Sequence, residues 1–414
     1  MLPKLIPGLL FFCTNLFCFF KCIAQEKIYF EPKAASGGKQ SDFITYKNII
    51  VFETTPESKF DKYSRIISTK KYLIVCDYSA KKILVFDKSG RFITKLKNKL
   101  DLGRLTYNEE KDRLEVVAQN KTYQLTNKDR SQILEDFNNP KNKKYYRKYF
   151  IDFSDTLHLT VHKQKISSVD ILNPIPYTNG MHIVNKITVD KNFAKEEDNE
   201  LKIYQGDSLV KQYFPYKKKN DSRYIYDDAT VAITPAVTTD TRWITHPYDY
   251  TIYALQKDSL YKVYSFVLPL ERAIPNDFFT REFQNKTEKD NYVRQNKKFI
   301  KQFYVFNLTN RYLNLTMQGM WYDMQQFIYD TKTKIFYDHE KIVPDSLTFF
   351  LPITKNLSFN DGPLIYSWIN AEEVLKVFES HQKDNILYPP LLQAYMNTAT
   401  ADSNPVLINF IYRN

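Results

Sequence analysis

The feature that most constrains the fold is a strand–turn–strand pattern that recurs along the chain. Its clearest copy is 250–266 (YTIYALQKDSLYKVYSF), where two runs of β-branched and aromatic residues flank the polar stretch 256–259. Such residues pack well on a pleated, half-buried surface, whereas Asp and Ser side chains hydrogen-bond the backbone of a turn. The pattern therefore predicts a β-hairpin.

The same hairpin is predicted at five other places. Their turns lie at 87–90, 127–130, 162–165, 205–208 and 330–333. Four strands with their turns need about 40 to 45 residues, which is the repeat length of a propeller blade. Most of these turns lie about 35 to 50 residues apart, so the sequence predicts one all-β domain, a six-bladed β-propeller, over 43–414.

Some predicted segments complete or interrupt the repeat. The second unit is predicted to contain strands at 113–117, 121–125 and 131–134, and the third to contain strands at 149–153, 157–161 and 166–171. Short helices are predicted within 276–296, from Asn370 and from Pro389, because alternation is lost there and capping residues appear. The strand-like segments 43–52 and 406–412 are predicted to share one blade, because a ring without free edge strands resists aggregation.

The N-terminal residues have the pattern of a signal peptide, predicted at 1–24. An apolar run at 9–20 follows Lys4 and ends at Lys21, which is too short for a membrane span of roughly 20 residues. The mature chain would then be exported to the periplasm or cell surface, without a transmembrane span, and 25–42 would be a flexible lead-in. An uncleaved anchor and a lipid on Cys22 remain alternatives.

Cysteine content and charge limit the possible functions. Only Cys76 of the four cysteines lies outside the predicted signal, so the mature chain has no internal disulfide, and Cys76 is predicted to be a buried, inert thiol. The net charge is +12, but the lysines are scattered and clusters such as 141–148 are short. We interpret them as solvated turn charge, with an acidic glycan or envelope surface as the alternative. Export argues against a nucleic-acid partner.

Local catalytic motifs are absent from the sequence. It contains no phosphate-binding loop, no Gly-x-Ser-x-Gly elbow, no His-Glu-x-x-His and no paired Cys-x-x-Cys. His158 and His162 alternate with apolar residues, as on a strand, where four residues span about 13 Å. One metal ion cannot bind both, so we predict no metal site there.

Two aromatic-rich stretches are the candidate ligand-binding sites. The first contributes Arg242, Trp243, His246 and Tyr248, and the second contributes Trp321 and Tyr322. On a strand, Arg242 and His246 would share one face and Trp243 would take the other. Arg, Trp and His at a propeller rim could hold an anionic or sugar-like ligand. A packed Trp with solvated neighbours is the alternative.

Four segments together resemble a known group of proteins. They are 72–96 (YLIVCDYSAKKILVFDKSGRFITKL), 201–216 (LKIYQGDSLVKQYFPY), 249–266 (DYTIYALQKDSLYKVYSF) and 403–410 (SNPVLINF). This set resembles the exported six-bladed β-propellers of Bacteroidota, which are distantly similar to NHL-type and TolB-like propellers and are largely without an assigned function. The resemblance implies the fold and carries over no catalytic residue.

These observations predict a monomeric binding scaffold at the cell envelope, with a protein or glycan ligand and no cofactor. The alternative is a metal-dependent propeller enzyme of the lactonase or lyase kind, which would hold Ca²⁺ with oxygens from several blades. Its candidate ligands are Asp77, Asp170, Asp228 and Asp249.

Overall fold

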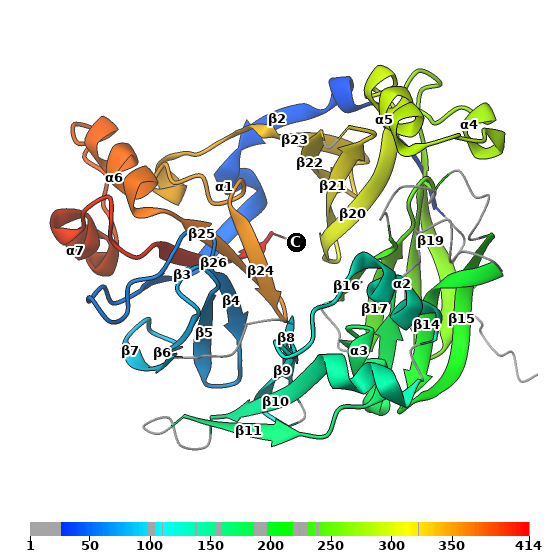
Figure 1. The fold of residues 1–414 in the computed structure, drawn as a ribbon. Coiled ribbons are helices and arrows are strands. Elements are labelled where there is room, and N and C mark those ends of the chain that lie inside the picture. The colour runs from blue at the N-terminus through cyan, green and yellow to red at the C-terminus, as the bar shows by residue number, and fades with distance from the viewer. Residues whose placement is uncertain are drawn as a thin grey trace, which may run out of the picture.

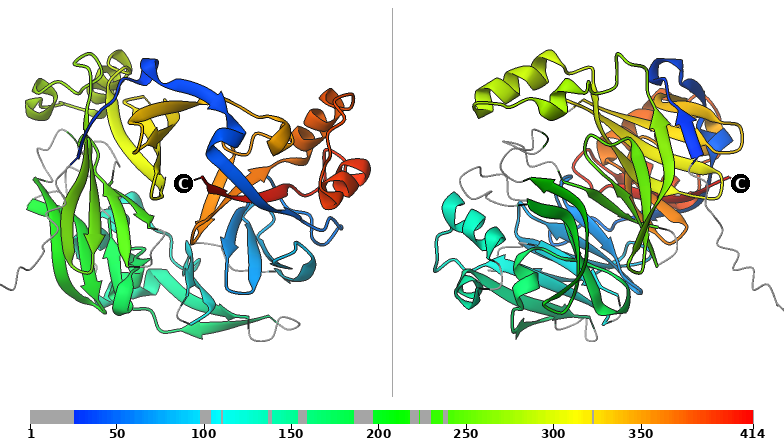
Figure 2. Two further views of the ribbon diagram at one scale, coloured as in Figure 1. Left: turned by 180° about the vertical axis from the view of Figure 1, so that it is seen from behind. Right: turned by 90° about the vertical axis from the view of Figure 1, so that its right-hand side faces the viewer.

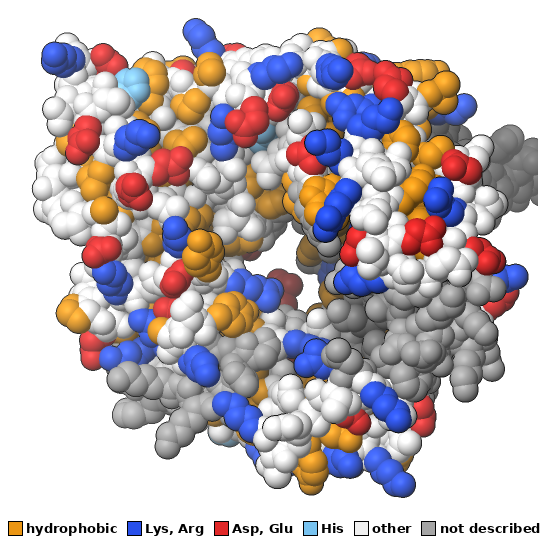
Figure 3. Space-filling view, turned by 45° about the horizontal axis from the view of Figure 1, so that its top comes forward, with side chains coloured by type: hydrophobic (Ala, Val, Ile, Leu, Met, Phe, Trp, Pro, Cys, Tyr) orange, Lys and Arg blue, Asp and Glu red, His pale blue; other side chains and the backbone are white. Residues whose placement is uncertain are grey.

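Six β-sheets stand around a central hollow in the computed structural model of the protein, as the blades of a propeller do (Figure 1). The structure describes residues 26–413 apart from 98–103, 110, 137–138, 154–158, 186–196, 218–222, 224–229, 237–239 and 322. The space-filling view shows the hollow, with basic side chains at its rim (Figure 3). The predicted fold class is therefore confirmed, whereas the predicted signal peptide lies outside the described residues.

Each blade has four antiparallel strands, and the first strand named for each blade lies nearest to the hollow while the last lies at the outer edge. Blade 1 consists of β4 (Arg65–Ser68), β5 (Tyr72–Asp77), β6 (Lys82–Asp87) and β7 (Phe92–Lys97), and blade 2 of β8 (Arg104–Asn108), β9 (Arg113–Gln119), β10 (Tyr146–Asp152) and β11 (Thr160–Gln164). Blade 3 consists of β12 (Ile175–Pro176), β13 (Met181–Val184), β14 (Glu197–Gln205) and β15 (Ser208–Lys217), and blade 4 of β16 (Ala232–Pro235), β17 (Thr241–Thr245), β18 (Thr251–Gln256) and β19 (Ser259–Val267). Blade 5 consists of β20 (Ile300–Leu308), β21 (Tyr312–Gly319), β22 (Met324–Asp330) and β23 (Ile335–Val343), and blade 6 of β24 (Leu357–Asp361), β25 (Leu364–Ile369), β26 (Val406–Tyr412) and β3 (Ile44–Val51).

Helices occur in the connections between strands. They are η1 (Pro32–Ala34), α1 (Gln40–Phe43), α2 (Asn127–Glu135), η2 (Pro140–Tyr145), α3 (Ser168–Ile171), η3 (Thr178–Gly180), α4 (Asp277–Thr280), α5 (Lys286–Gln295), η4 (Ser346–Thr348), α6 (Ala371–Ser380) and α7 (Pro390–Thr398). The helices predicted within 276–296, after Asn370 and after Pro389 are confirmed as α4 with α5, α6 and α7. In the right-hand view of Figure 2, α2 and the α4–α5 pair project from the same side of the ring.

The turn between β6 and β7 shows how the sequence sets a hairpin. The Asp87 carboxylate accepts hydrogen bonds from the amides of Ser89 at 2.9 Å and Arg91 at 3.0 Å. Gly90 has φ +92°, and a Cβ there would lie 2.3 Å from the carbonyl oxygen of Val51. Only glycine fits this position, where blade 1 touches the closing strand of blade 6.

The ring is closed by the two ends of the chain, as predicted. β3 pairs antiparallel with β26, from Val51 opposite Val406 to Ile44 opposite Tyr412. β3 is therefore the outermost strand of a blade whose other three strands are C-terminal. This pairing joins the two ends of the propeller and covers the outer edge of β26.

The prediction of a flexible lead-in at 25–42 is wrong for the described residues, because residues 26–43 pack on the outer edges of two blades. β1 (Glu26–Tyr29) runs parallel to β19 of blade 4, and β2 (Ser36–Lys39) runs parallel to β23 of blade 5. Phe30 is 1% exposed and meets the rings of Phe266, Phe303, Phe327 and Phe336. This strap was not predicted because Gly and Ser at 36–38 favour flexibility in isolation. In the folded chain they allow close approach, since a Cβ on Gly37 would lie 2.6 Å from the Lys341 carbonyl oxygen.

The prediction that the second and third hairpins belong to separate blades is also wrong, because the strands observed in this part of the chain form the single blade 2. β10 pairs with β9 on one side and with β11 on the other. Residues 121–125 form no strand, and 131–134 lie in α2, which Thr126 and Asp129 begin with a reciprocal capping box. Residues 168–171, predicted as strand, form α3 with Ser167 as its N-cap. Six remains the number of blades because β24, β25, β26 and β3 form the sixth.

Five of the six seams between neighbouring blades are filled with buried apolar side chains. Counted over the described residues, the cluster at the seam between blades 5 and 6 has twenty buried residues, whereas the cluster at the seam between blades 2 and 3 has four. A hydrogen bond near the inner strands also crosses each junction in the described part of the ring. These bonds are Arg65 to Leu105 O, Arg104 to Ile171 O, Arg242 to Pro176 O, Thr234 to Val305 O, Asn360 to Phe306 O, and Ser68 to Asp361.

The buried cysteine and the helix lengths bear on two further predictions. Cys76 is fully buried in blade 1, and burial raises the pKa of its thiol to about 12, which agrees with an inert core cysteine. Among the described residues, no helix has both the length and the apolar character needed to span a bilayer.

Candidate functional site: a charged seam between blades 2 and 3

Blade 2 presents polar side chains towards blade 3 because of strand alternation. Leu114 and Val116 of β9 are fully buried in the apolar cluster shared with blade 1. Arg113 and Glu115 alternate with them, so these side chains lie on the opposite face. Lys148 of β10 pairs in register with Val117 and Gln164, and it therefore joins the same face.

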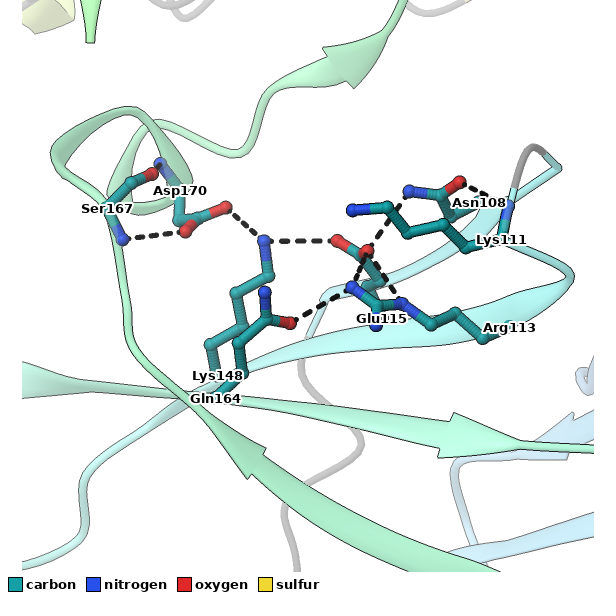
Figure 4. A network of polar contacts seen from close by, with 8 residues as sticks. All are labelled: Asn108, Lys111, Arg113, Glu115, Lys148, Gln164, Ser167 and Asp170. Atoms are coloured by element: carbon teal, nitrogen blue, oxygen red, sulfur yellow. Dashed lines mark hydrogen bonds and ion pairs between the residues drawn. The ribbon is translucent and has the colours of Figure 1, made fainter. Parts of the chain in front are cut away.

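These side chains form the continuous network drawn in Figure 4. Lys148 Nζ lies 3.0 Å from Glu115 Oε2 and 2.7 Å from Asp170 Oδ1. Arg113 Nη2 lies 2.8 Å from Glu115 Oε1 and donates to Gln164 Oε1 at 3.2 Å. Each carboxylate of the network is thus paired with at least one cation.

Asp170 brings the connection between blades 2 and 3 into this network. It lies in α3, where its carboxylate accepts the amide of Ser167 at 2.8 Å and the Ser167 hydroxyl accepts the Asp170 amide at 3.2 Å. The Val169 amide donates to Asp207 Oδ1 of blade 3 at 3.1 Å. α3 is therefore a wedge that is hydrogen-bonded to both blades.

An aromatic stack extends the network towards the outer strand. The Arg113 guanidinium lies 4.4 Å from the centre of the Phe150 ring, and the His162 ring stacks on Phe150 at 4.7 Å. His162 is exposed on β11, as its strand pattern predicted, whereas His158 lies outside the described residues. The guanidinium is thus held both by the Glu115 carboxylate and by a ring face.

The pKa shifts follow from this geometry. Burial alone would raise the pKa of Glu115, but hydrogen bonds from Arg113 and the charge of Lys148 outweigh it and lower that pKa to about 2. Burial alone would lower the pKa of Lys148, but Asp170 and Glu115 outweigh it and raise that pKa. Burial lowers the pKa of the neighbouring His182, so its imidazole is neutral at pH 7. Glu115 and Lys148 therefore stay charged near neutral pH and are poor proton-transfer groups there.

The seam can act chemically as a charged clamp with polar groups at its margin. Asn108 donates to Glu115 Oε1 at 3.1 Å, and Gln164 accepts from Arg113. His182 Nδ1 is buried and has no hydrogen-bond partner among the described residues. Amide and imidazole groups at the margin of an ion network are suited to hydrogen-bonding a polar ligand.

The residues predicted around β17 do not form one site. Trp243 packs in the apolar seam between blades 4 and 5, whereas Arg242 lies 5.4 Å from the Tyr177 ring of blade 3. His246 is 4% exposed, and its Nε2 contacts the buried Glu200 carboxylate of blade 3. The predicted division of faces is thus observed, but His246 is buried rather than solvated.

The remaining predicted ligand-binding residues are also separated. Tyr248 is buried against α4, with its ring 5.0 Å from Phe278. Trp321 is 38% exposed, and the Arg294 guanidinium of α5 lies 4.9 Å from its ring. Tyr322 lies outside the described residues. Of the described residues in the predicted set, Trp321 is the one on the surface.

The aspartates that were candidate Ca²⁺ ligands for the enzyme alternative lie apart from one another, as far as the structure describes them. Asp77 lies in blade 1 beside Lys82, Asp170 lies in α3 beside Lys148, and Asp249 accepts from Tyr253 in blade 4. Asp228 lies outside the described residues. Within the described ranges, no group of three His, Cys, Asp or Glu residues could hold a metal ion.

The charged seam was not predicted from the sequence, although one signal was present. Arg113, Glu115 and Lys148 lie at alternate positions of strands whose other face is aliphatic. This pattern predicts a polar face but not what covers it. The interpretation of the 141–148 cluster as solvated turn charge is wrong for Lys148, because its side chain is 11% exposed.

Comparisons with known proteins agree with the fold. A family model described as a 6-bladed β-propeller, DUF5128, matches residues 26–99, which comprise the strap, β3 and blade 1. The structure is similar to that of a candidate exported protein from Bacteroides fragilis, with a TM-score of 0.58 and 13% identity, covering 94% of this chain and 99% of that chain. A DUF4221 family member from Bacteroides vulgatus has a TM-score of 0.43 and 9% identity, with 90% and 98% coverage. No curated protein matches the chain. The resemblance to exported six-bladed propellers is thereby confirmed at the level of the fold.

Proposed function

We propose that this chain is an exported propeller that serves as a binding scaffold at the cell envelope, in the periplasm or on the cell surface. Its ligand is a glycan or a protein, held at the charged seam between blades 2 and 3. The observation that carries the proposal is the contrast between this seam and the other five. The other seams are filled mainly with aliphatic and aromatic side chains, whereas this seam gathers amide, imidazole and charged groups at one place.

The arrangement supports binding more directly than catalysis. The ionised groups are paired at 2.7 to 3.0 Å, and the low pKa of Glu115 makes it a weak base near neutral pH. Paired charges hold their geometry, which reduces the entropy lost when a ligand binds. Export is supported by the N-terminal apolar pattern at 9–20 and by the description of the Bacteroides fragilis protein.

The test is a ligand screen with variants at the margin of the seam. The full-length protein, produced with its own leader, is screened on a glycan array and used to capture proteins from an envelope extract. Asn108→Ala with Gln164→Ala removes margin groups while leaving Lys148 and its carboxylates in place. We expect a ligand whose binding falls at least tenfold in this variant and is retained in a control with Asn48→Ala and Gln325→Ala on blades 6 and 5. Equal binding by both variants would contradict the seam as the site.

The metal-dependent enzyme stays open as a second function and is tested separately. A Ca²⁺ site built from several blades would raise the melting temperature when calcium is added and lower it with EDTA. For a scaffold without a cofactor we expect the same melting temperature with EDTA and with calcium. A shift of several degrees would favour the enzyme.

A further inference from the structure

The insertion between β9 and β10 forms a fixed platform on blade 2. It contains α2 and η2, and Asn120 joins its two ends. The Asn120 amide donates to Tyr145 O, and its side chain donates to Lys144 O, both at 2.8 Å. Thr126 and Asp129 cap α2. The two ends of the insertion are therefore tied to each other where it leaves β9 and enters β10.

Basic side chains on this platform are not neutralised by the described residues. Residues 120–145 contain six basic and three acidic residues, a formal charge of +3. Lys128, Arg130, Lys141 and Lys144 are exposed, and none forms an ion pair with a described residue. The Asp129 carboxylate is hydrogen-bonded to Thr126, and that of Asp136 to Asn139.

Two tyrosines lie among these cations. The rings of Tyr123 and Tyr145 meet edge to face at 5.9 Å, and Lys144 Nζ lies 5.5 Å and 4.9 Å from their centres. Tyr123 is 39% exposed. At the base of the platform, burial and the charge of Arg130 both lower the pKa of Arg104, which indicates crowded positive charge.

We propose that this basic platform, defined as Lys128, Arg130, Lys141 and Lys144 with Tyr123, binds an acidic polysaccharide. Cations attract carboxylate or sulfate groups, and a tyrosine ring offers an apolar face to a sugar ring. An anionic membrane fits less well because Tyr123 offers little apolar area for insertion, so that lipid headgroups would be held by charge alone. The proposal extends the scaffold function to a second surface and a stated ligand class, so it rests on that function in part.

The experiment measures binding of the full-length protein to polygalacturonate and to heparin by affinity electrophoresis and calorimetry, at low and high salt. The platform variant is Lys128→Gln, Arg130→Gln and Lys144→Gln. The matched control is Lys62→Gln, Lys70→Gln and Lys71→Gln on blade 1, which removes the same charge from exposed residues. We expect binding that weakens with salt and falls about tenfold in the platform variant but less than twofold in the control.

Several results would overturn this proposal. They are no binding at low salt, equal losses in the two variants, or binding to phosphatidylglycerol vesicles or single-stranded DNA as strong as that to the polysaccharides. An equal loss would indicate non-specific attraction by net charge. Failure of polysaccharide binding together with a seam-dependent ligand in the array and capture screen would leave the scaffold function intact. Polysaccharide binding without a seam-dependent ligand would support the basic platform and contradict the charged seam as a binding site.

Discussion

The seams between blades 5 and 6 and between blades 2 and 3 join the same kinds of sheet by opposite means. At the former, buried side chains from β3, β25 and β26 pack against blade 5 and against α7. At the latter, Lys148 bridges two carboxylates, and four buried apolar residues of the described chain cluster beside the network. Apolar packing is non-directional and depends little on moderate salt, whereas an ion network needs specific partners and is costly when one is removed. The ring is thus held by apolar packing at the seam between blades 5 and 6 and by paired charges at the seam between blades 2 and 3.

The largest expected effect is at the closure. Phe410→Ala removes a fully buried ring from the seam between blades 5 and 6, and we expect a loss of about 3 to 5 kcal/mol in the free energy of unfolding. Urea denaturation measures it. Phe279→Ala, at a ring that is 41% exposed on α4, is the control and should cost less than about 0.5 kcal/mol. Similar losses for the two variants would mean that the closure contributes no special stability.

Mild acid should lower the stability of blade 5 before it weakens the charged seam between blades 2 and 3. His339 of β23 is buried with its Nδ1 3.0 Å from Thr354 O, and burial lowers its pKa from 6.5 to about 4. The folded state then binds fewer protons than the unfolded state, so this stability is present above pH 6.5 and is lost as pH falls towards 4. The loss is about 3 kcal/mol. Urea midpoints across this range measure it, and His339→Gln should flatten the dependence. An unchanged slope would exclude His339 as its source.

Removal of the bridging cation is the next largest effect. Lys148→Met leaves Glu115 and Asp170 without their shared partner in a half-buried position, and we expect a loss of about 2 kcal/mol. Lys95→Met is the matched control. It breaks the 2.6 Å pair with Glu57, whose carboxylate side chain is 64% exposed, and should cost less than about 1 kcal/mol. Equal costs would show that the seam behaves as an ordinary surface ion pair.

The smallest expected effect is the response to salt. Raising the ionic strength should lower the hydrogen-exchange protection of β9 and β10 by about 0.5 to 1 kcal/mol, because their network is partly open to solvent. Protection of β25 and β26 should stay the same. A uniform change across the ring would remove the distinction between the two seams.

Most of the framework could be predicted from local patterns, and the misses have physical causes. The turn of blade 1 was predictable because Asp87 and Gly90 act within a few residues of each other. Residues 121–134 were misassigned because Thr126 and Asp129 cap a helix inside a run of strand-like spacing. The strap at 26–43 was missed because Phe30 gains its stability from rings more than 200 residues away in the chain.

The candidate site could be predicted only in part. Alternation placed Arg113 and Glu115 on a polar face, but alternation cannot distinguish a face that meets solvent from one that meets Asp170. Likewise, Arg242, Trp243 and His246 are neighbours in the chain but point into two different seams.

The amino-acid sequence by itself determined most of the strands, most turns and the sharing of one blade by the two chain ends, because these depend on side-chain alternation and short-range hydrogen bonds. The predicted number of six blades agrees with the structure only because two predicted hairpins fall in blade 2 while β24, β25, β26 and β3 add a further blade. Only the tertiary structure decided which seam is charged, where the strap lies and which basic residues have no ion-pair partner among the described residues. Those properties depend on side chains that are distant in sequence and become neighbours only when the ring closes.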